Sequence, residues 1–206
     1  MIAIIDYGVG NLFSLTASLG YLGADVVVTD RKEDIEAADK IILPGVGAFE
    51  DAIARLHATG LVDTIMKEAS GGKPLLGICL GMQLLFEESH EYGVHKGLGL
   101  IKGTISSIEE ELETAGVKGL KVPHIGWNSL SFAEGEPLFK YISQGDCVYY
   151  VHSFYGKGCE DSTIATSEYG IEVTGAVRNG SVYGTQFHPE KSGGVGLNIL
   201  KAFMEV

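Results

Sequence analysis

The stretch from Lys73 to Gln83 constrains this chain more than any other. Its apolar run is bounded by Lys73-Pro74 and is too short to cross a membrane, so it is typical of a buried parallel strand. The residues after Gly81 are typical of the start of a helix. Cys79 therefore falls at a strand-to-helix turn, with Gly77 and Gly81 two residues away on either side. Gly-x-Ser-x-Gly sequences use this spacing to force a nucleophile onto a tight, exposed elbow.

A cysteine at such an elbow has a chemical use. Its side chain projects above the sheet, where backbone N–H groups at the start of the next helix stabilise a thiolate and can hold a developing oxyanion. The position predicts that Cys79 is a nucleophile. The alternative from this stretch alone is a buried structural cysteine, because free cysteines are among the most buried residues.

The first half of the chain alternates apolar runs with helical patterns, which predicts a doubly wound, mostly parallel sheet. The expected strands before the Cys79 strand are residues 2–5, 24–29 and 40–43. The expected helices are residues 12–22, which end before Gly23, a short helical segment within 31–39, then 50–57 and 61–69. The helix after Gly81 is expected to continue through Phe86 to an acidic end, Glu87 to Glu91.

The second half has a different pattern, with alternating and β-branched runs separated by turns. Arg178-Asn179-Gly180 is a strong signal for a two-residue hairpin, and residues 193–205 form a closing helix. The fold class expected is α/β, with a mostly parallel central sheet, flanking helices and antiparallel or mixed strands in the C-terminal half. No linker-like segment divides the chain, so we expect a single domain, residues 1–206. The runs expected as strands are 98–108, 122–132, 147–155, 162–167, 171–177 and 181–187.

Two glycine-rich turns follow the first and third strands. Gly8-Val9-Gly10 lacks the third glycine and the acidic ribose partner of a dinucleotide turn, which disfavours nucleotide binding there. Pro44-Gly45-Val46-Gly47 lies at the same sheet edge as Cys79, where ligands bind in such folds. It is either a plain hinge or a backbone donor toward the carbonyl that Cys79 attacks.

Charge and cysteine content narrow the possible partners. The formal net charge of −12 disfavours nucleic acid and favours a small molecule or a basic protein surface. Three cysteines in a chain whose first residues already begin a strand indicate a reducing compartment, the cytoplasm, and no leader. No apolar run approaches the ~20 residues that cross a bilayer.

A thiolate that attacks an acyl carbon needs a base, and histidine has a suitable pKa. His188 follows the run Tyr183 to Phe187 and precedes Pro189-Glu190. Proline biases the residue before it to an extended conformation, so Glu190 can turn back toward the imidazole. We expect a Cys79-His188-Glu190 relay, although a His-Pro-Glu segment alone is also typical of a surface turn.

These motifs resemble those of the class I, triad-type glutamine amidotransferases. The resemblance rests on Gly77 to Gln83, Gln186 to Glu190 and the oxyanion strand Pro44 to Gly47. Within the family, four further segments resemble the glutaminase subunits of imidazole glycerol phosphate synthase. They are Asp6 to Asn11, Pro123 to Asn128, Tyr150 to Tyr155 and His188 to Ser192.

The resemblance implies that the chain hydrolyses glutamine to glutamate and ammonia, without a cofactor or metal. It assigns Cys79 as nucleophile, His188 as proton shuttle and Glu190 as its orienting partner, with Gly47 and Leu80 forming the oxyanion hole. It also places four residues around the α-amino and α-carboxylate groups of glutamine, although these four could instead be ordinary helix and strand surface. The four are Gln83, Glu91, Ser153 and Phe154.

The implied ammonia needs an acceptor that this chain does not carry. By resemblance the partner is a (β/α)₈-barrel cyclase subunit in a heterodimer, which makes imidazole glycerol phosphate and aminoimidazole carboxamide ribonucleotide in histidine biosynthesis. The residues expected to face it are Asn11, Trp127, Tyr149 and Lys191, although Trp127 could equally be a core aromatic.

Two other interpretations stay open from sequence alone. The chain could serve another class I amidotransferase, in anthranilate, aminodeoxychorismate or pyridoxal phosphate synthesis, although Pro123 to Asn128 argues against this. It could also be a non-catalytic flavodoxin-like binding module with a structural Cys79.

Overall fold

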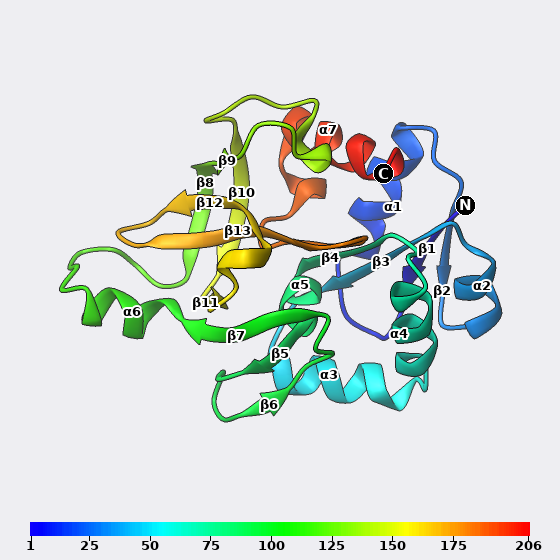
Figure 1. The fold of residues 1–206 in the computed structure, drawn as a ribbon, viewed down its shortest axis with the longest axis horizontal. Coiled ribbons are helices and arrows are strands. Elements are labelled where there is room, and N and C mark those ends of the chain that lie inside the picture. Colours follow the sequence, from blue (N-terminus) through cyan, green and yellow to red (C-terminus); the bar gives the residue numbers. More distant parts are fainter.

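One large sheet forms the centre of the molecule (Figure 1). The structure, a computed structural model, describes all 206 residues. The strand order is β2-β1-β3-β4-β14-β13-β12-β9, in which the first five strands are parallel and the last three add on antiparallel. In that order the bounds are Val26–Thr29, Ile2–Ile5, Lys40–Gly45, Leu75–Cys79, Val182–Thr185, Glu172–Asn179, Thr163–Glu168 and Ser131–Phe132.

Helices cover both faces of the parallel part, which confirms the doubly wound α/β arrangement (Figure 1). One face carries α1 (Leu12–Tyr21) and α7 (Gly193–Met204). The other carries α2 (Lys32–Ala37), α3 (Phe49–Ala58), α4 (Val62–Ser70) and α5 (Leu80–Leu84). None of these helices combines the length and the apolar character needed to cross a membrane.

The rest of the chain adds a second sheet and a two-stranded ribbon, of which the alternating runs predicted the strands after Leu98 but not β5 or β6. The second sheet has the order β11-β7-β5-β6, and the ribbon pairs β10 with β8. Their bounds are β5 Phe86–Ser89, β6 His95–Lys96, β7 Ile101–Ser107, β8 His124–Ser129, β10 Cys147–His152 and β11 Phe154–Lys157. The remaining elements are α6 (Ile108–Thr114), which the sequence patterns did not predict, and the 3₁₀ turns η1 (Pro137–Phe139), η2 (Glu160–Ser162) and η3 (Pro189–Lys191).

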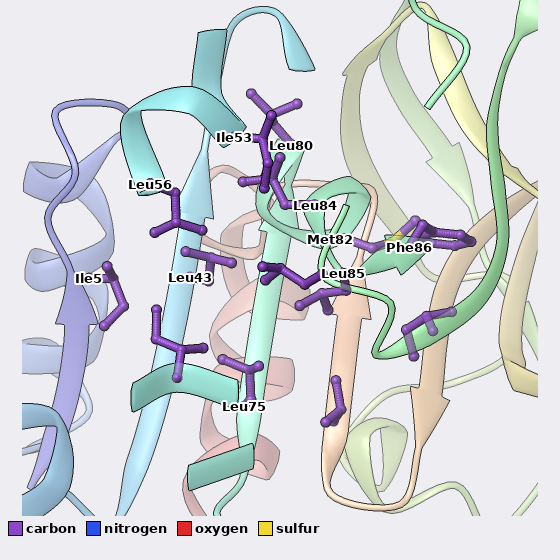
Figure 2. Packing of buried hydrophobic residues seen from close by; sticks show 14 of the residues in the cluster. Ile5, Leu43, Ile53, Leu56, Leu75, Leu80, Met82, Leu84, Leu85 and Phe86 are labelled. Carbon is purple, nitrogen blue, oxygen red and sulfur yellow. The ribbon is translucent and has the colours of Figure 1, made fainter. Parts of the chain in front are cut away.

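Two apolar cores lie on opposite faces of the sheet. Figure 2 shows part of one of them, where Leu43 and Leu75 on the strands lie with Leu56 of α3 and Leu84 of α5. The other is built by α1 and α7, and Leu15 of the predicted α1 stripe is almost completely buried in it. Burial of this kind contributes roughly 25 cal/mol of folding free energy per Å² of apolar surface. The two apolar cores therefore hold the helices against the sheet.

The expected turns are present with small shifts. Helix α1 ends in a Schellman motif, in which Gly23 N–H donates to Gly20 O and Ala24 N–H donates to Leu19 O. Gly23 has φ +81°, a conformation that glycine adopts without strain. The predicted hairpin joins β13 to β14, but Asn179 pairs with Val182, so its loop is Gly180-Ser181.

The prediction that the helix after Gly81 continues through Phe86 to an acidic end at Glu87 to Glu91 is wrong. Helix α5 ends at Leu84, and Phe86 begins β5. The loop from Gly97 to Leu100 occupies the carbonyls that a longer helix would use: Leu98 N–H donates to Leu84 O, Gly99 N–H to Phe86 O and Leu100 N–H to Leu85 O. This non-local pairing overrides the helical pattern of the apolar residues.

The turn around Cys79 depends on two glycines that touch backbone. A Cβ on Gly81 would lie 1.8 Å from the carbonyl oxygen of Leu43, and one on Gly77 would lie 2.6 Å from Gly81 O. Strand β3, strand β4 and helix α5 therefore approach one another more closely than any side chain allows. The glycine spacing is a packing requirement of the elbow.

We predict that Gly81→Ala lowers the free energy of unfolding by about 3 kcal/mol or more, because backbone atoms must move to admit the methyl group. Urea unfolding measures the change. Gly20→Ala is the matched control, because a Cβ at this exposed position in α1 meets nothing within 4 Å. It should leave stability unchanged or raise it by up to about 1 kcal/mol. Equal midpoints for Gly81→Ala and the wild type would contradict the packing argument.

Candidate active site

Cys79 lies where β4 meets α5, in a strained backbone conformation with φ 54° and ψ −112°. Non-glycine residues rarely adopt this region, and such strain is concentrated at functional sites. The side chain is largely buried at 7% exposure, yet it lines a cavity of about 400 Å³. The expected elbow is thus present, with its sulfur at the wall of a pocket.

His188 and Glu190 form a buried pair next to this elbow. Their side chains are each 3% exposed, and His188 Nδ1 lies 2.8 Å from Glu190 Oε1. Burial alone would lower the pKa of His188, but the nearby Cys79 sulfur and the Glu190 carboxylate raise it to about 9. The other ring nitrogen, Nε2, is buried and makes no hydrogen bond. An imidazole held by one nitrogen with the other free is arranged for proton transfer.

The cavity brings together most of the residues that the resemblance assigned to the site. Its lining residues come from six separate parts of the chain. The predicted residues among them are Gly47, Cys79, Leu80, Gln83, Glu91, Ser153, Phe154, His188 and Lys191. Glu190 lies behind His188 and instead lines a much smaller cavity.

Gln83 is a buried part of the pocket wall and not helix surface. It is 5% exposed, and its Nε2 donates to Phe154 O at 3.1 Å and to Gln186 Oε1 at 3.0 Å. Gln186 Nε2 in turn lies 3.8 Å from Cys79 Sγ. Two side-chain amides, those of Gln83 and Gln186, therefore connect the cavity wall to the sulfur.

Glu91 is also not helix surface, because it follows β5 in a turn. Its Oε2 accepts the N–H of Phe49 at 2.7 Å and so satisfies an unpaired donor at the start of α3. Burial raises the pKa of Glu91, while the Phe49 hydrogen bond and the nearby His95 oppose this. Its carboxylate thus belongs both to a helix cap and to the cavity lining.

The oxyanion segment is more constrained than its glycines suggested. Strand β3 extends through Gly45, which pairs with Cys79, and Tyr7 OH donates to Pro44 O at 2.6 Å. A Cβ at Gly45 would lie 2.8 Å from Gly81 N, whereas at Gly47, with φ +102°, it would meet nothing within 4 Å. Backbone freedom is therefore confined to Gly47 and its neighbour Val46.

The residues expected to face a partner lie around the pocket. Trp127 is 57% exposed, which excludes its alternative as a core aromatic, and its ring contacts Tyr149 edge to face. Tyr149 O accepts the N–H of His188 at 3.0 Å, so this part of β10 is tied to the triad. Lys191 lines the main cavity, and Asn11 lines the small cavity behind Glu190.

Three further lining or linking residues escaped the sequence patterns: Gln186, His152 and Tyr92. Gln186 and His152 are polar residues inside apolar strand runs, which is a usable signal because buried polar groups need partners. Tyr92 has φ +55°, an unusual conformation that nothing in its sequence indicated.

Comparisons with known proteins agree with this geometry. Residues 3–206 match the family model described as glutamine amidotransferase class-I. Curated relatives named imidazole glycerol phosphate synthase subunit HisH are similar over the whole chain. The one from Listeria monocytogenes serotype 4a (strain HCC23) is 48% identical over 100% of this chain and 96% of its own length. The one from Geobacillus kaustophilus (strain HTA426) is 49% identical over 100% and 97%.

A solved structure supports the fold independently. A chain of PurLQS from Thermotoga maritima superposes with a TM-score of 0.73 and 21% identity, covering 99% of this chain and 97% of that one. The same family is indicated by the family model, by the full-length identity to the relatives and by the cysteine elbow. The chain belongs to the class-I glutamine amidotransferase family, among the HisH subunits of imidazole glycerol phosphate synthase.

Proposed function

We propose that this amidotransferase subunit hydrolyses the side-chain amide of glutamine with Cys79 as nucleophile, His188 as proton shuttle and Glu190 as the residue that orients His188. The observation that carries the assignment is the strained Cys79 beside the buried His188–Glu190 pair. A structural cysteine would need neither the strain nor the adjoining cavity. A non-catalytic flavodoxin-like module is therefore disfavoured.

In the first half of the reaction the Cys79 sulfur attacks the amide carbon of glutamine. The carbonyl π-electrons move to oxygen, and the backbone N–H groups around Gly47 and Leu80 stabilise that negative charge. His188, whose raised pKa keeps it protonated at neutral pH, gives a proton to the amide nitrogen. The C–N bond breaks, ammonia leaves, and a thioester joins Cys79 to the glutamyl group.

In the second half water attacks the thioester carbon and His188, now neutral, accepts the water proton. Collapse of the second tetrahedral species breaks the C–S bond, which releases glutamate and restores the Cys79–His188 pair. Glu190 keeps its charge throughout and holds Nδ1 of His188 through the 2.8 Å contact. Its role is orientation and electrostatic stabilisation.

The amino and carboxylate groups of glutamine need fixed polar partners. Both hydrogens of the Gln83 amide are used inside the protein, so its Oε1 is the acceptor left for an ammonium group. Glu91 adds negative charge to the same cavity, and Ser153 and Phe154 also line it. These four residues are our proposed glutamine contacts.

A partner is part of the proposal, because ammonia is useful only if it reaches an acceptor before water protonates it. The relatives' names make them subunits of imidazole glycerol phosphate synthase. We infer a barrel-type cyclase subunit as partner, bound at the face that carries Asn11, Trp127, Tyr149 and Lys191. Exposed Ile125, 58% accessible, adds apolar surface beside Trp127 on β8. These relatives also argue against anthranilate, aminodeoxychorismate or pyridoxal phosphate synthesis.

Cys79→Ala should abolish glutamine hydrolysis, by at least about 10⁴-fold in kcat, because no other group can form the thioester. Folding and partner binding should persist, since the side chain faces a cavity. Ammonia release and a binding titration with the cyclase subunit measure the two effects. Cys147→Ala is the matched control, because this cysteine is exposed. Turnover retained in a pure Cys79→Ala preparation would refute the nucleophile assignment.

Glu190→Gln should be milder than His188→Asn. The first change keeps a hydrogen-bond partner and removes only a charge, which lowers kcat by up to roughly 10⁴-fold; the second removes the proton shuttle itself and costs more, on the order of 10⁶-fold. Steady-state kinetics on both variants give the order. Greater damage from Glu190→Gln would show that the carboxylate takes part in proton transfer directly.

We predict that the isolated chain is a poor glutaminase and that the partner with its nucleotide ligand activates it. The reason is the free peptide at Gly47, which can turn its N–H toward or away from the oxyanion at small cost. One oxyanion donor is worth about 10² to 10³ in rate. The measurement is kcat for the isolated chain, for the complex and for the complex with its nucleotide ligand. Equal kcat values in all three would contradict the switch. A change confined to KM would show that the partner controls glutamine binding instead.

A further inference from the structure

Two buried histidines take no part in the mechanism above. His124 on β8 and His152 on β10 are paired in register, and His124 Nδ1 lies 2.9 Å from His152 Nε2. They are 3% and 6% exposed. Burial lowers the pKa of His124 to about 4 and that of His152 to about 3, with the neighbouring histidines lowering the latter further. Both rings are therefore neutral at pH 7, and each carries a single N–H.

The hydrogen-bond partners decide where those protons are. His152 Nδ1 faces the carbonyl oxygen of Phe154 at 2.9 Å, and a carbonyl only accepts, so Nδ1 carries the proton. The bare Nε2 of His152 must then accept from Nδ1–H of His124. His124 Nε2 is left as an acceptor and faces Asn128 Nδ2 at 3.4 Å. All donors point one way, from Asn128 through the two rings to Phe154.

The Phe154 carbonyl is where this series of hydrogen bonds reaches the proposed glutamine pocket. It accepts from His152 on one side and from Gln83 Nε2 on the other, at 3.1 Å. Both lone pairs are therefore occupied, which fixes the carbonyl and with it the Gln83 amide. Gln83 also donates to Gln186, which contacts the Cys79 sulfur. The series of hydrogen bonds thus ends at Cys79, the proposed nucleophile.

Two stacked tyrosine rings fix the orientation of the His124 ring. His124 stacks between Tyr150 and Tyr169, with centroid separations of 4.7 and 4.0 Å and interplanar angles of 25° and 26°. The Tyr150 ring is held by complete burial, and Tyr169 OH donates to Lys121 O at 2.7 Å. A ring clamped on both faces cannot rotate to exchange its two nitrogens.

We propose that His124 and His152 are positioning residues of the glutamine site, which act through the Phe154 carbonyl to aim Gln83 Oε1 at the ammonium end of the substrate. The proposal rests on the proposed function in one respect, that Gln83 contacts glutamine. It gives His124 and Asn128, in the segment Pro123 to Asn128, a role distinct from the exposed Trp127 between them.

The tautomers are tested directly on the wild-type chain by ¹⁵N NMR of its histidine side chains near pH 7. We expect both buried rings to be neutral with the proton on Nδ1, the form that is the minor one in free imidazole side chains. Exposed His57 gives the internal reference signal of a solvent-facing imidazole. A proton on Nε2 of either ring, or a charged ring, would overturn the relay whatever the enzyme's activity.

The functional test uses the complex with the cyclase subunit at saturating concentration. His124→Leu removes the donor to His152 and should raise KM for glutamine about tenfold, the size of one lost hydrogen bond, with kcat changed less than about threefold. His124→Asn places an amide donor near the Nδ1 position and should restore KM to within about threefold of wild type. Tyr150→Phe is the control for destabilisation of the same ribbon, because it removes the Ser167 bond and keeps the stacked ring.

A double-mutant cycle separates positioning from a purely structural role. In a Gln83→Ala background, His124→Leu should raise KM no further, because the acceptor it positions is gone. Additive effects on KM, an unchanged KM in folded His124→Leu, or an equal rise in Tyr150→Phe would each overturn the proposal. Absence of glutamine hydrolysis in the wild-type complex would refute the proposed function instead, while the NMR result would still decide the proton positions.

Discussion

The close approach of α5 to the end of β3 determines the rest of the site. Gly81 packs against the Leu43 carbonyl so tightly that a Cβ would lie 1.8 Å from that oxygen, and Gly45 packs against Gly81 N in the same way. The chain can leave β4 into a helix at this distance only if Cys79 adopts a strained conformation. The strain aims the sulfur into the cavity, and the packing of β3, β4 and α5 holds it there. Nucleophile geometry is thus a consequence of backbone packing, not of the cysteine itself.

Three buried histidines near the cavity have pKa values shifted in opposite directions. His188 has its pKa raised to about 9, because burial is outweighed by the Cys79 sulfur and the Glu190 carboxylate. Burial lowers the pKa of His124 to about 4, and burial together with the nearby His124 and His188 lowers that of His152 to about 3. One ring is therefore kept charged and able to give a proton, while the other two stay neutral and can only orient. In a low-dielectric site, the partner decides the role that a buried histidine can take.

The sequence was most informative where function depends on local backbone. The glycine spacing around Cys79 and the His188-Pro189-Glu190 turn predicted the elbow and the buried pair, since each depends on residues close in sequence. It was least informative where non-local pairing decides. The segment Leu84 to Phe86 has a helical pattern, but the N–H groups of Leu98 to Leu100 convert it into the start of a strand. In the same way, the Gln186 contact to Cys79 joins residues 107 positions apart, which no local pattern reveals.

The distribution of hydrogen bonds around the pocket indicates where control can act. Gln83, Gln186 and the two neutral histidines tie one wall to the sulfur, and Glu91 is held by the start of α3. Pro44 and Gly45 are held in turn by Tyr7 and by pairing with Cys79. Gly47 differs from all of these, because a Cβ built on it would meet nothing within 4 Å. A peptide rotation there disturbs few contacts, whereas movement of the other walls breaks several hydrogen bonds, each worth about 1 kcal/mol. In the proposed mechanism, a partner that acts on Val46-Gly47 therefore changes the oxyanion donor while the proposed nucleophile and glutamine contacts stay in place.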